Sequence, residues 1–151
     1  MLARIINTRT DAAPLIARVA LGLIILSHGA QHAFGLFGGY GFSGTLGWMT
    51  KTLGFPSPLA ALAIITEVVA PVALVIGLGG RLAALGIGGI MLGAITTHAS
   101  NGFFMNWFGS LPAGSEGFEY HLLVLALVTV VVIAGSGALS LDARLVRRHR
   151  G

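Results

Sequence analysis

The sequence contains no cysteine among its 151 residues, and charged side chains make up only 9% of it. The lack of cysteine excludes disulfide bonds, thiol-based redox sites and cysteine-ligated zinc or iron–sulfur centres. A soluble domain has about 25% charged residues, so the low charge argues against a soluble globule. The hydrophobic content of 55% and the mean hydropathy of +0.89 exclude a disordered chain. These features together predict a small membrane protein.

Four apolar stretches are long enough to cross the hydrocarbon core of a bilayer, which takes about 20 helical residues. They cover residues 14–34, 58–78, 81–100 and 118–139. Pro14 and Pro58 fall at helix starts, where the missing N–H of proline costs least. The sequence therefore predicts an all-α fold: one membrane domain over residues 1–151, built as a four-helix bundle with up-down topology. Residues 140–151 follow as a basic tail.

Arginine is distributed unevenly about these stretches. Seven arginines fall on one side of an up-down bundle: Arg4, Arg9, Arg81, Arg144, Arg147, Arg148 and Arg150. Arg18 is close to the same side and can extend its side chain to it, and only Lys51 falls on the other side. Because Lys and Arg concentrate on the cytoplasmic side of membrane proteins, both termini are predicted to be cytoplasmic. The pI near 10.8 reflects this bias, so no nucleic-acid partner is expected.

Two loops are predicted on the opposite, outer side. Residues 35–57 are rich in glycine and then amphipathic, which predicts a helix lying in the membrane interface. Residues 101–117 gather four aromatic side chains of the kind that mark the head-group level. Anchoring is the simpler interpretation of both loops, and a lid over a site is the alternative. A signal peptide over residues 1–34 is not favoured, because no clear cleavage site follows the apolar run.

Six ionisable side chains from four predicted helices fall in the outer half of the bundle: His28, His32, Glu67, His98, Glu119 and His121. An ionisable group inside a membrane is costly, so it marks a site by default. Glu67 is the deepest, since it follows Pro58 by nine residues, or roughly 13 Å of helix. Glu119 and His121 are two residues apart and cannot both face inward. We expect Glu119 to face inward and His121 to lie at the lipid boundary.

Three kinds of ligand suit this set of side chains. Imidazole and carboxylate groups bind iron, copper or zinc, for which His28, His32 and His98 are the candidates. A histidine pair on facing helices, His28 or His32 with His98, could hold a haem. A quinone head group could accept hydrogen bonds from the histidines, while Glu67 exchanges its protons. The alternative for each residue is a structural one, in helix packing or at the head groups.

The third stretch contains Gly86, Gly89 and Gly93, and the last two form a G-x-x-x-G pair. Such a pair allows helices to approach closely. Packing within the bundle is the favoured interpretation, and a homo-oligomer is the alternative.

The motifs of this chain, taken in order, resemble those of the DoxX family. They are HGAQHAFGLFGGYGFSGT from residue 28, GFPSP, the pair Thr66–Glu67, the turn Gly80–Arg81, THASNGFF, GFEY and SLD. The resemblance extends over nearly the whole chain. It implies a four-helix protein of the bacterial inner membrane, associated with quinol oxidase or thiosulfate:quinone oxidoreductase systems. Many family members are described as oxidoreductases without a demonstrated reaction.

The resemblance also implies functional weight for individual residues: His28, Glu67, His98, Asn101 and Glu119. The chain departs from the family pattern at two positions. His32 stands where the family usually has lysine, which makes metal or haem ligation more plausible there. His121 stands where the family often has proline, which weakens a shared role for it.

We therefore expect an electron-transfer protein that binds a redox ligand, a quinone above all, in the outer half of the bundle. Glu67, His28, His98 and Glu119 are the predicted catalytic residues, and His32 and Asn101 complete the predicted binding set. A partner redox enzyme would supply or accept the electrons. The alternative is a non-catalytic scaffold that recruits such an enzyme. A small transporter is less favoured, because the inner half of the spans offers almost only Arg18 as a polar group.

Overall fold

Helices are the only regular elements in the part of the chain that the computed structural model describes, namely residues 8, 11–112 and 114–148. The four long ones are α2 (Ala12–Phe34), α4 (Ser57–Ile76), α5 (Gly80–His98) and α6 (Glu119–Ala134). The short ones are η1 (Leu36–Gly38), α3 (Gly41–Lys51), η2 (Ala99–Asn101) and α7 (Leu141–Arg148). The all-α prediction is confirmed. By length and composition, α2, α4 and the stretch from α5 through η2 could each cross a membrane.

The fourth apolar helix is shorter than the sequence predicts. α6 has 16 residues and ends at Ala134, whereas the predicted span continued to residue 139. The helix stops because Gly135 and Gly137 adopt positive φ angles of 84° and 75°, which residues with a side chain rarely adopt. The predicted end of this span is therefore wrong. Part of the predicted basic tail forms α7, while Arg4, Arg9 and Arg150 lie outside the described residues.

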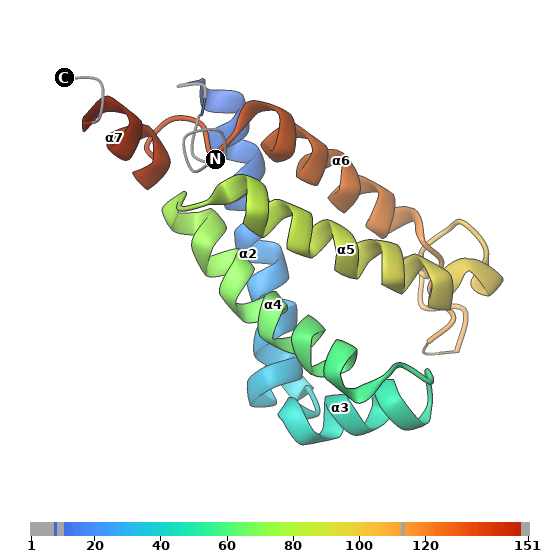
Figure 1. The fold of residues 1–151 in the computed structure, drawn as a ribbon. Helices are drawn as coiled ribbons and strands as arrows, with labels where there is room; N and C mark the ends of the chain where they lie inside the picture. The colour runs from blue at the N-terminus through green and yellow to red at the C-terminus, as the bar shows by residue number, and fades with distance from the viewer. Residues whose placement is uncertain (1–7, 9–10, 113, 149–151) are drawn as a thin grey trace.

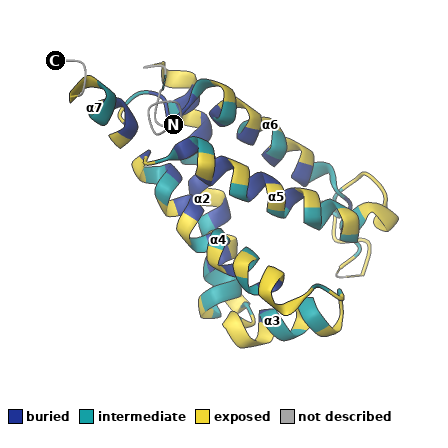
Figure 2. Cartoon of the chain, in the orientation of Figure 1, coloured by how far each residue is buried: buried dark blue, intermediate teal, exposed yellow. Residues whose placement is uncertain are grey.

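The long helices form two antiparallel pairs, α2 with α4 and α5 with α6. The pairs meet at the end that carries α7 and diverge toward the end that carries α3 (Figure 1). Glycines allow the close approaches: a methyl group at Gly29 would collide with the α4 backbone, and one at Gly88 would lie 3.2 Å from Val128. Buried residues lie on the facing sides of the helices, while the outer faces are exposed (Figure 2). This pattern places the apolar core near the α7 end.

A buried arginine joins several chain segments at the α7 end. The guanidinium of Arg18 donates hydrogen bonds to the carbonyls of Leu74 and Val75 in the last turn of α4, and to those of Ser136, Ala138 and Leu139 after α6. The side chain is only 1% exposed. The prediction that Arg18 extends to the membrane surface is therefore wrong, because helix-end carbonyls within reach satisfy its donors instead.

Asp142 at the start of α7 completes this group. Its carboxylate accepts hydrogen bonds from the backbone N–H groups of Gly79 and Gly80 and from the Ser136 hydroxyl, at 2.9, 3.2 and 2.6 Å. Arg18, Ser136 and Asp142 are called the arginine clasp below. The clasp ties α2, the α4–α5 turn, the segment after α6 and α7 to one another.

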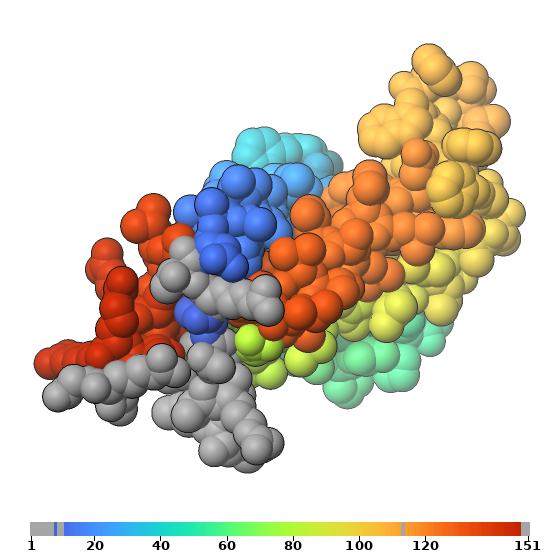
Figure 3. Space-filling model, turned by 90° about the horizontal axis from the view of Figure 1, so that it is seen from above, coloured from blue at the N-terminus to red at the C-terminus, as the bar shows by residue number. Residues whose placement is uncertain are grey.

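The opposite end of the molecule holds α3 and the segment between η2 and α6. This segment projects away from the helices (Figure 3). The sequence predicts a helix in the membrane interface within residues 35–57, and α3 confirms the helix itself. The aromatic side chains at this end are largely exposed: Phe34, Phe37, Tyr40, Phe104, Trp107 and Phe108. Exposed aromatic side chains in such numbers are typical of the head-group region of a membrane.

Candidate functional site

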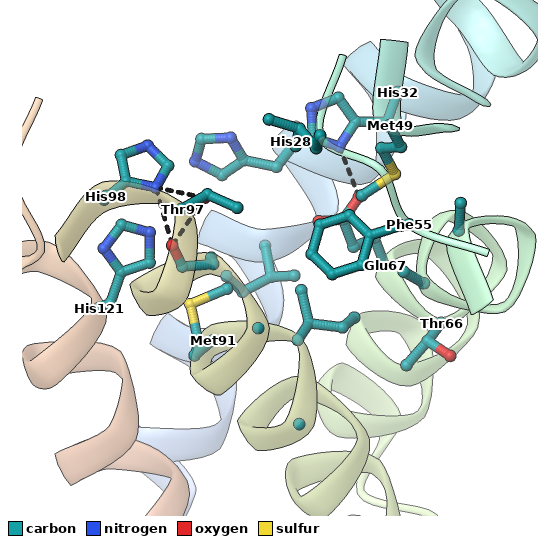
Figure 4. A pocket seen from close by; sticks show the side chains of 18 of the residues that line it. His28, His32, Met49, Phe55, Thr66, Glu67, Met91, Thr97, His98 and His121 are labelled. Atoms are coloured by element: carbon teal, nitrogen blue, oxygen red, sulfur yellow. Dashed lines mark hydrogen bonds and ion pairs between the residues drawn. The ribbon is translucent and has the colours of Figure 1, made fainter. Parts of the chain in front are cut away.

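A cavity of about 600 Å³ opens where the two helix pairs diverge. Its walls come from α2, α3, α4, α5, the segment before α6, and α6 itself (Figure 4). Most of the lining is apolar. The polar side chains are few: His28, His32, Thr66, Glu67, Thr97, His98, Glu116, Tyr120 and His121. A concave apolar site with a small number of polar groups is the usual form of a site for an organic ligand.

His32 and Glu67 form a hydrogen-bonded pair on the α2–α4 side of the cavity. The His32 Nδ1 and Glu67 Oε2 atoms are 2.5 Å apart. Glu67 is 5% exposed, and it lies opposite Gly29, where the absence of a side chain lets α2 approach α4. An imidazole and a carboxylate in direct contact can pass a proton between them. This pair is thus suited to deliver or accept a proton deep in the cavity.

His98 and His121 form the second pair, on the α5–α6 side. Their ring centroids are 4.8 Å apart and the ring planes are inclined by 43°. The Nδ1 atom of His98 lies 2.9 Å from the Ala94 carbonyl, which can only accept, so Nδ1 carries the hydrogen. In neutral His98 the Nε2 atom is therefore the acceptor. It could receive a hydrogen bond or a proton from a ligand.

His28 lies between these two pairs (Figure 4). Its ring centroid is 6.1 Å from that of Tyr120, which lies 5.8 Å from the His121 ring in turn. The Tyr120 hydroxyl and the His121 Nδ1 are buried and have no hydrogen-bond partner among the described residues. A buried polar atom without a partner carries a free-energy penalty of about 1–3 kcal/mol. A ligand that supplied partners would remove that penalty.

Two predicted site residues do not line the cavity. Glu119 turns toward the loop before α6, where its Oε2 accepts hydrogen bonds from the Met105 backbone and the Trp107 indole at 3.2 and 3.1 Å. Asn101 donates hydrogen bonds to the carbonyls of Gly114 and Glu116 in the same loop. Both residues hold the loop that contributes Met105 and Glu116 to the cavity wall.

The expected facing of Glu119 and His121 is reversed. His121 is 8% exposed and lies within the bundle, whereas Glu119 is half-buried against the loop. The spacing of the apolar residues contained this information, because His121 continues the buried face of α6 formed by Val124, Val128 and Val131. Our prediction was wrong because it gave the charge of Glu119 more weight than this periodicity. Tyr120 was missed altogether, although it belongs to the GFEY motif.

The structure thus brings together four of the predicted residues, His28, His32, Glu67 and His98, and adds Tyr120 and His121. Within the described residues, no group of three or more His, Cys, Asp or Glu side chains is placed to hold a metal ion. The arrangement offers hydrogen-bond donors, acceptors and proton-exchanging groups around an apolar space.

Long apolar helices define an α-helical membrane protein, and a mostly apolar cavity opens between its helix pairs. The family model described as DoxX matches residues 13–100, which is more than half of the chain. The chain belongs to the DoxX family. No curated protein and no solved structure matches it. The matched range includes α2 to α5, while α6 with Tyr120 and His121 lies beyond it.

Proposed function

We propose that this DoxX-family protein lies in the bacterial inner membrane, with α2, α4, α5 and α6 crossing it alternately. The clustering of arginine at the α7 end supports a cytoplasmic location for that end and for both termini. α3 would then lie in the outer interface. With 16 residues, α6 is about 24 Å long, somewhat less than the ~30 Å hydrocarbon core. Local thinning of the bilayer and snorkelling of flanking residues accommodate such a difference.

The cavity would bind a quinone-type redox ligand near the outer face. The observation that carries this proposal is the His32–Glu67 pair within a mostly apolar cavity of about 600 Å³. A quinone has a flat apolar ring that suits the lining and carbonyl oxygens that accept hydrogen bonds. His28 and His98 would bind the head group from either side. Glu119 and Asn101 would support the site by holding the loop.

Reduction of a quinone to a quinol takes two electrons and two protons. We propose that Glu67 and His32 exchange the protons, since their contact allows a proton to move between a buried and a half-buried group. The electrons would come from, or go to, a partner redox enzyme. The chain would then act as an electron-transfer accessory subunit, in which the protein positions the ring and controls its protonation.

The proposal is tested by the content of the purified full-length chain. We expect extraction and chromatography to recover a quinone at close to one molecule per chain. Glu67→Gln should lower that content severalfold without loss of folded protein, because it replaces the carboxylate of the His32–Glu67 pair by a neutral amide that cannot take up a proton. Asp11→Asn is the matched control, since Asp11 is exposed and lies at the α7 end, away from the cavity.

Other outcomes would decide against quinone. Haem absorbance or a stoichiometric metal that disappears in Glu67→Gln would replace quinone by that group. A chain without any ligand, unchanged in the variant, would contradict the proposal. If Glu67→Gln instead prevents folding or assembly with a partner enzyme, the polar cluster serves helix packing, as expected for a scaffold.

A further inference from the structure

The two helices α4 and α5 touch at one level and separate beyond it. A methyl group built at Gly86 of α5 would lie 3.0 Å from the Thr66 side chain of α4. Toward the α3 end the helices diverge (Figure 1), and the cavity continues between them. The opening between α4 and α5 is called the α4–α5 groove below. Its lining includes Leu59, Leu62 and Thr66 from α4, and Gly86, Gly89 and Gly93 from α5.

Two glycines of α5 beyond Gly86, namely Gly89 and Gly93, do not pack against another described helix. Apart from the adjacent residues and the backbone of α5 itself, no atom of the described residues lies within 4 Å of the position that a methyl group would occupy at Gly89 or Gly93. By contrast, Gly88 faces α6 and Val128. The predicted packing of Gly89 and Gly93 within the bundle is therefore wrong. On the other side of the groove, Leu59 and Leu62 are 51% and 60% exposed.

The groove is continuous with the polar part of the cavity. His121, 8% exposed and with an unpartnered Nδ1, lines the same cavity, as does Tyr120 with its unpartnered hydroxyl. These atoms indicate that the end of the space next to α6 holds the polar part of a ligand. The opposite end, between α4 and α5, is apolar and opens onto the exposed surfaces of these two helices. Such a space suits a ligand with a polar head and a hydrocarbon chain.

We propose that the α4–α5 groove is a lateral entrance from the bilayer, and that it holds the hydrocarbon chain of a lipid-soluble ligand whose head group binds among the histidines. This inference rests on the proposed function, since it places the quinone-type ring in the polar part of the cavity. It specifies the substrate class further, as a quinone with a long alkyl or isoprenoid chain. Because positions 89 and 93 are glycine, the hydrocarbon chain of the quinone can lie directly on the α5 backbone.

A binding experiment with two quinones distinguishes the contribution of the hydrocarbon chain from that of the head group. The full-length protein in lipid nanodiscs is titrated with decylubiquinone, which has a ten-carbon chain, and with tetramethyl-1,4-benzoquinone, which has none. In Gly89→Leu and Gly93→Leu, leucine fills the groove, and we expect affinity for decylubiquinone to fall about fivefold to tenfold through lost packing. Affinity for the tetramethyl compound should stay within about twofold, as for a change outside its contacts.

Thr96→Leu is the matched control, because Thr96 is an exposed residue of α5 outside the cavity lining. It should leave both affinities unchanged. The glycine variants should fold, since open space surrounds both positions and leucine favours a helix more than glycine does. Circular dichroism and size-exclusion chromatography check this directly.

The outcomes distinguish the groove from the site. In one outcome, the wild type binds both quinones while the glycine variants lower the affinity for both equally or for neither. The proposal about the groove is then wrong, and the proposed head-group site stands. If the wild type binds neither, the proposed function fails and the groove proposal with it. If Gly89→Leu converts a dimer into a monomer, the groove is an interface between two copies and the proposal is overturned.

Discussion

Replacement of Arg18 tests the arginine clasp most directly. The guanidinium makes five hydrogen bonds to carbonyl oxygens of two separate segments, and the side chain is almost fully buried. Arg18→Met keeps most of the apolar stem and removes every donor. The carbonyls in the last turn of α4 and in the segment after α6 then lose their partner together.

The magnitude follows from these contacts. A hydrogen bond to a charged group contributes about 1.5–3 kcal/mol, but the guanidinium itself has a desolvation penalty of several kcal/mol. Each buried carbonyl that loses its donor costs about 1–3 kcal/mol, and the removed desolvation penalty of the guanidinium offsets part of the sum. We therefore expect Arg18→Met to lower the free energy of unfolding by about 4 kcal/mol. Arg18→Lys should retain part of this stability, because an ammonium has three donors and cannot span both segments.

Unfolding in mixed detergent and dodecyl sulfate micelles, followed by circular dichroism, measures the change. Arg144→Met is the control, since Arg144 is an exposed arginine of α7; it should not alter the unfolding midpoint. If Arg18→Met unfolds at the same midpoint as this control, the clasp does not stabilise the fold. The reasoning from buried hydrogen bonds would then be refuted.

Two further predictions concern the α3 end. Tyr120→Phe should stabilise the ligand-free protein by about 1 kcal/mol, because it removes a buried hydroxyl that has no partner among the described residues. Tyr40→Phe is the control, since Tyr40 is exposed, and it should not change the stability. A lower melting temperature for Tyr120→Phe would show that the hydroxyl has a partner. Glu119→Gln should weaken the contact to the Trp107 indole, so that tryptophan fluorescence shifts and limited proteolysis of the loop accelerates; an unchanged digestion rate would contradict the role of Glu119 in holding the loop.

The helices follow from the sequence because apolar runs and helix-breaking residues determine them locally. The bounds of α4 and α5 lie within two residues of the predicted ones. Pro58 lies in the first turn of α4, and Gly77 ends it in the left-handed conformation. The end of α6 was missed because the apolar run of valine and isoleucine continues up to Ala134, and Ala138 and Leu139 beyond it are apolar again. Hydropathy alone cannot separate them.

Side-chain direction was predicted less well than helix position. His28, His32 and Glu67 were placed correctly in one region, because α2 and α4 pack against each other and each has one inward face. Gly89 and Gly93 were misinterpreted because the divergence of the helix pairs is a tertiary property. Arg18 was misplaced for a similar reason, since its carbonyl partners come from segments 56 or more residues away.

The cavity takes its last wall from a helix outside the range that the family model matches. Tyr120 and His121 of α6 complete a space whose other sides come mainly from α2 to α5. A related chain could therefore keep the His32–Glu67 pair and change which molecules fit by substitutions in α6 alone. Selectivity and proton chemistry would then be able to diverge independently within one scaffold.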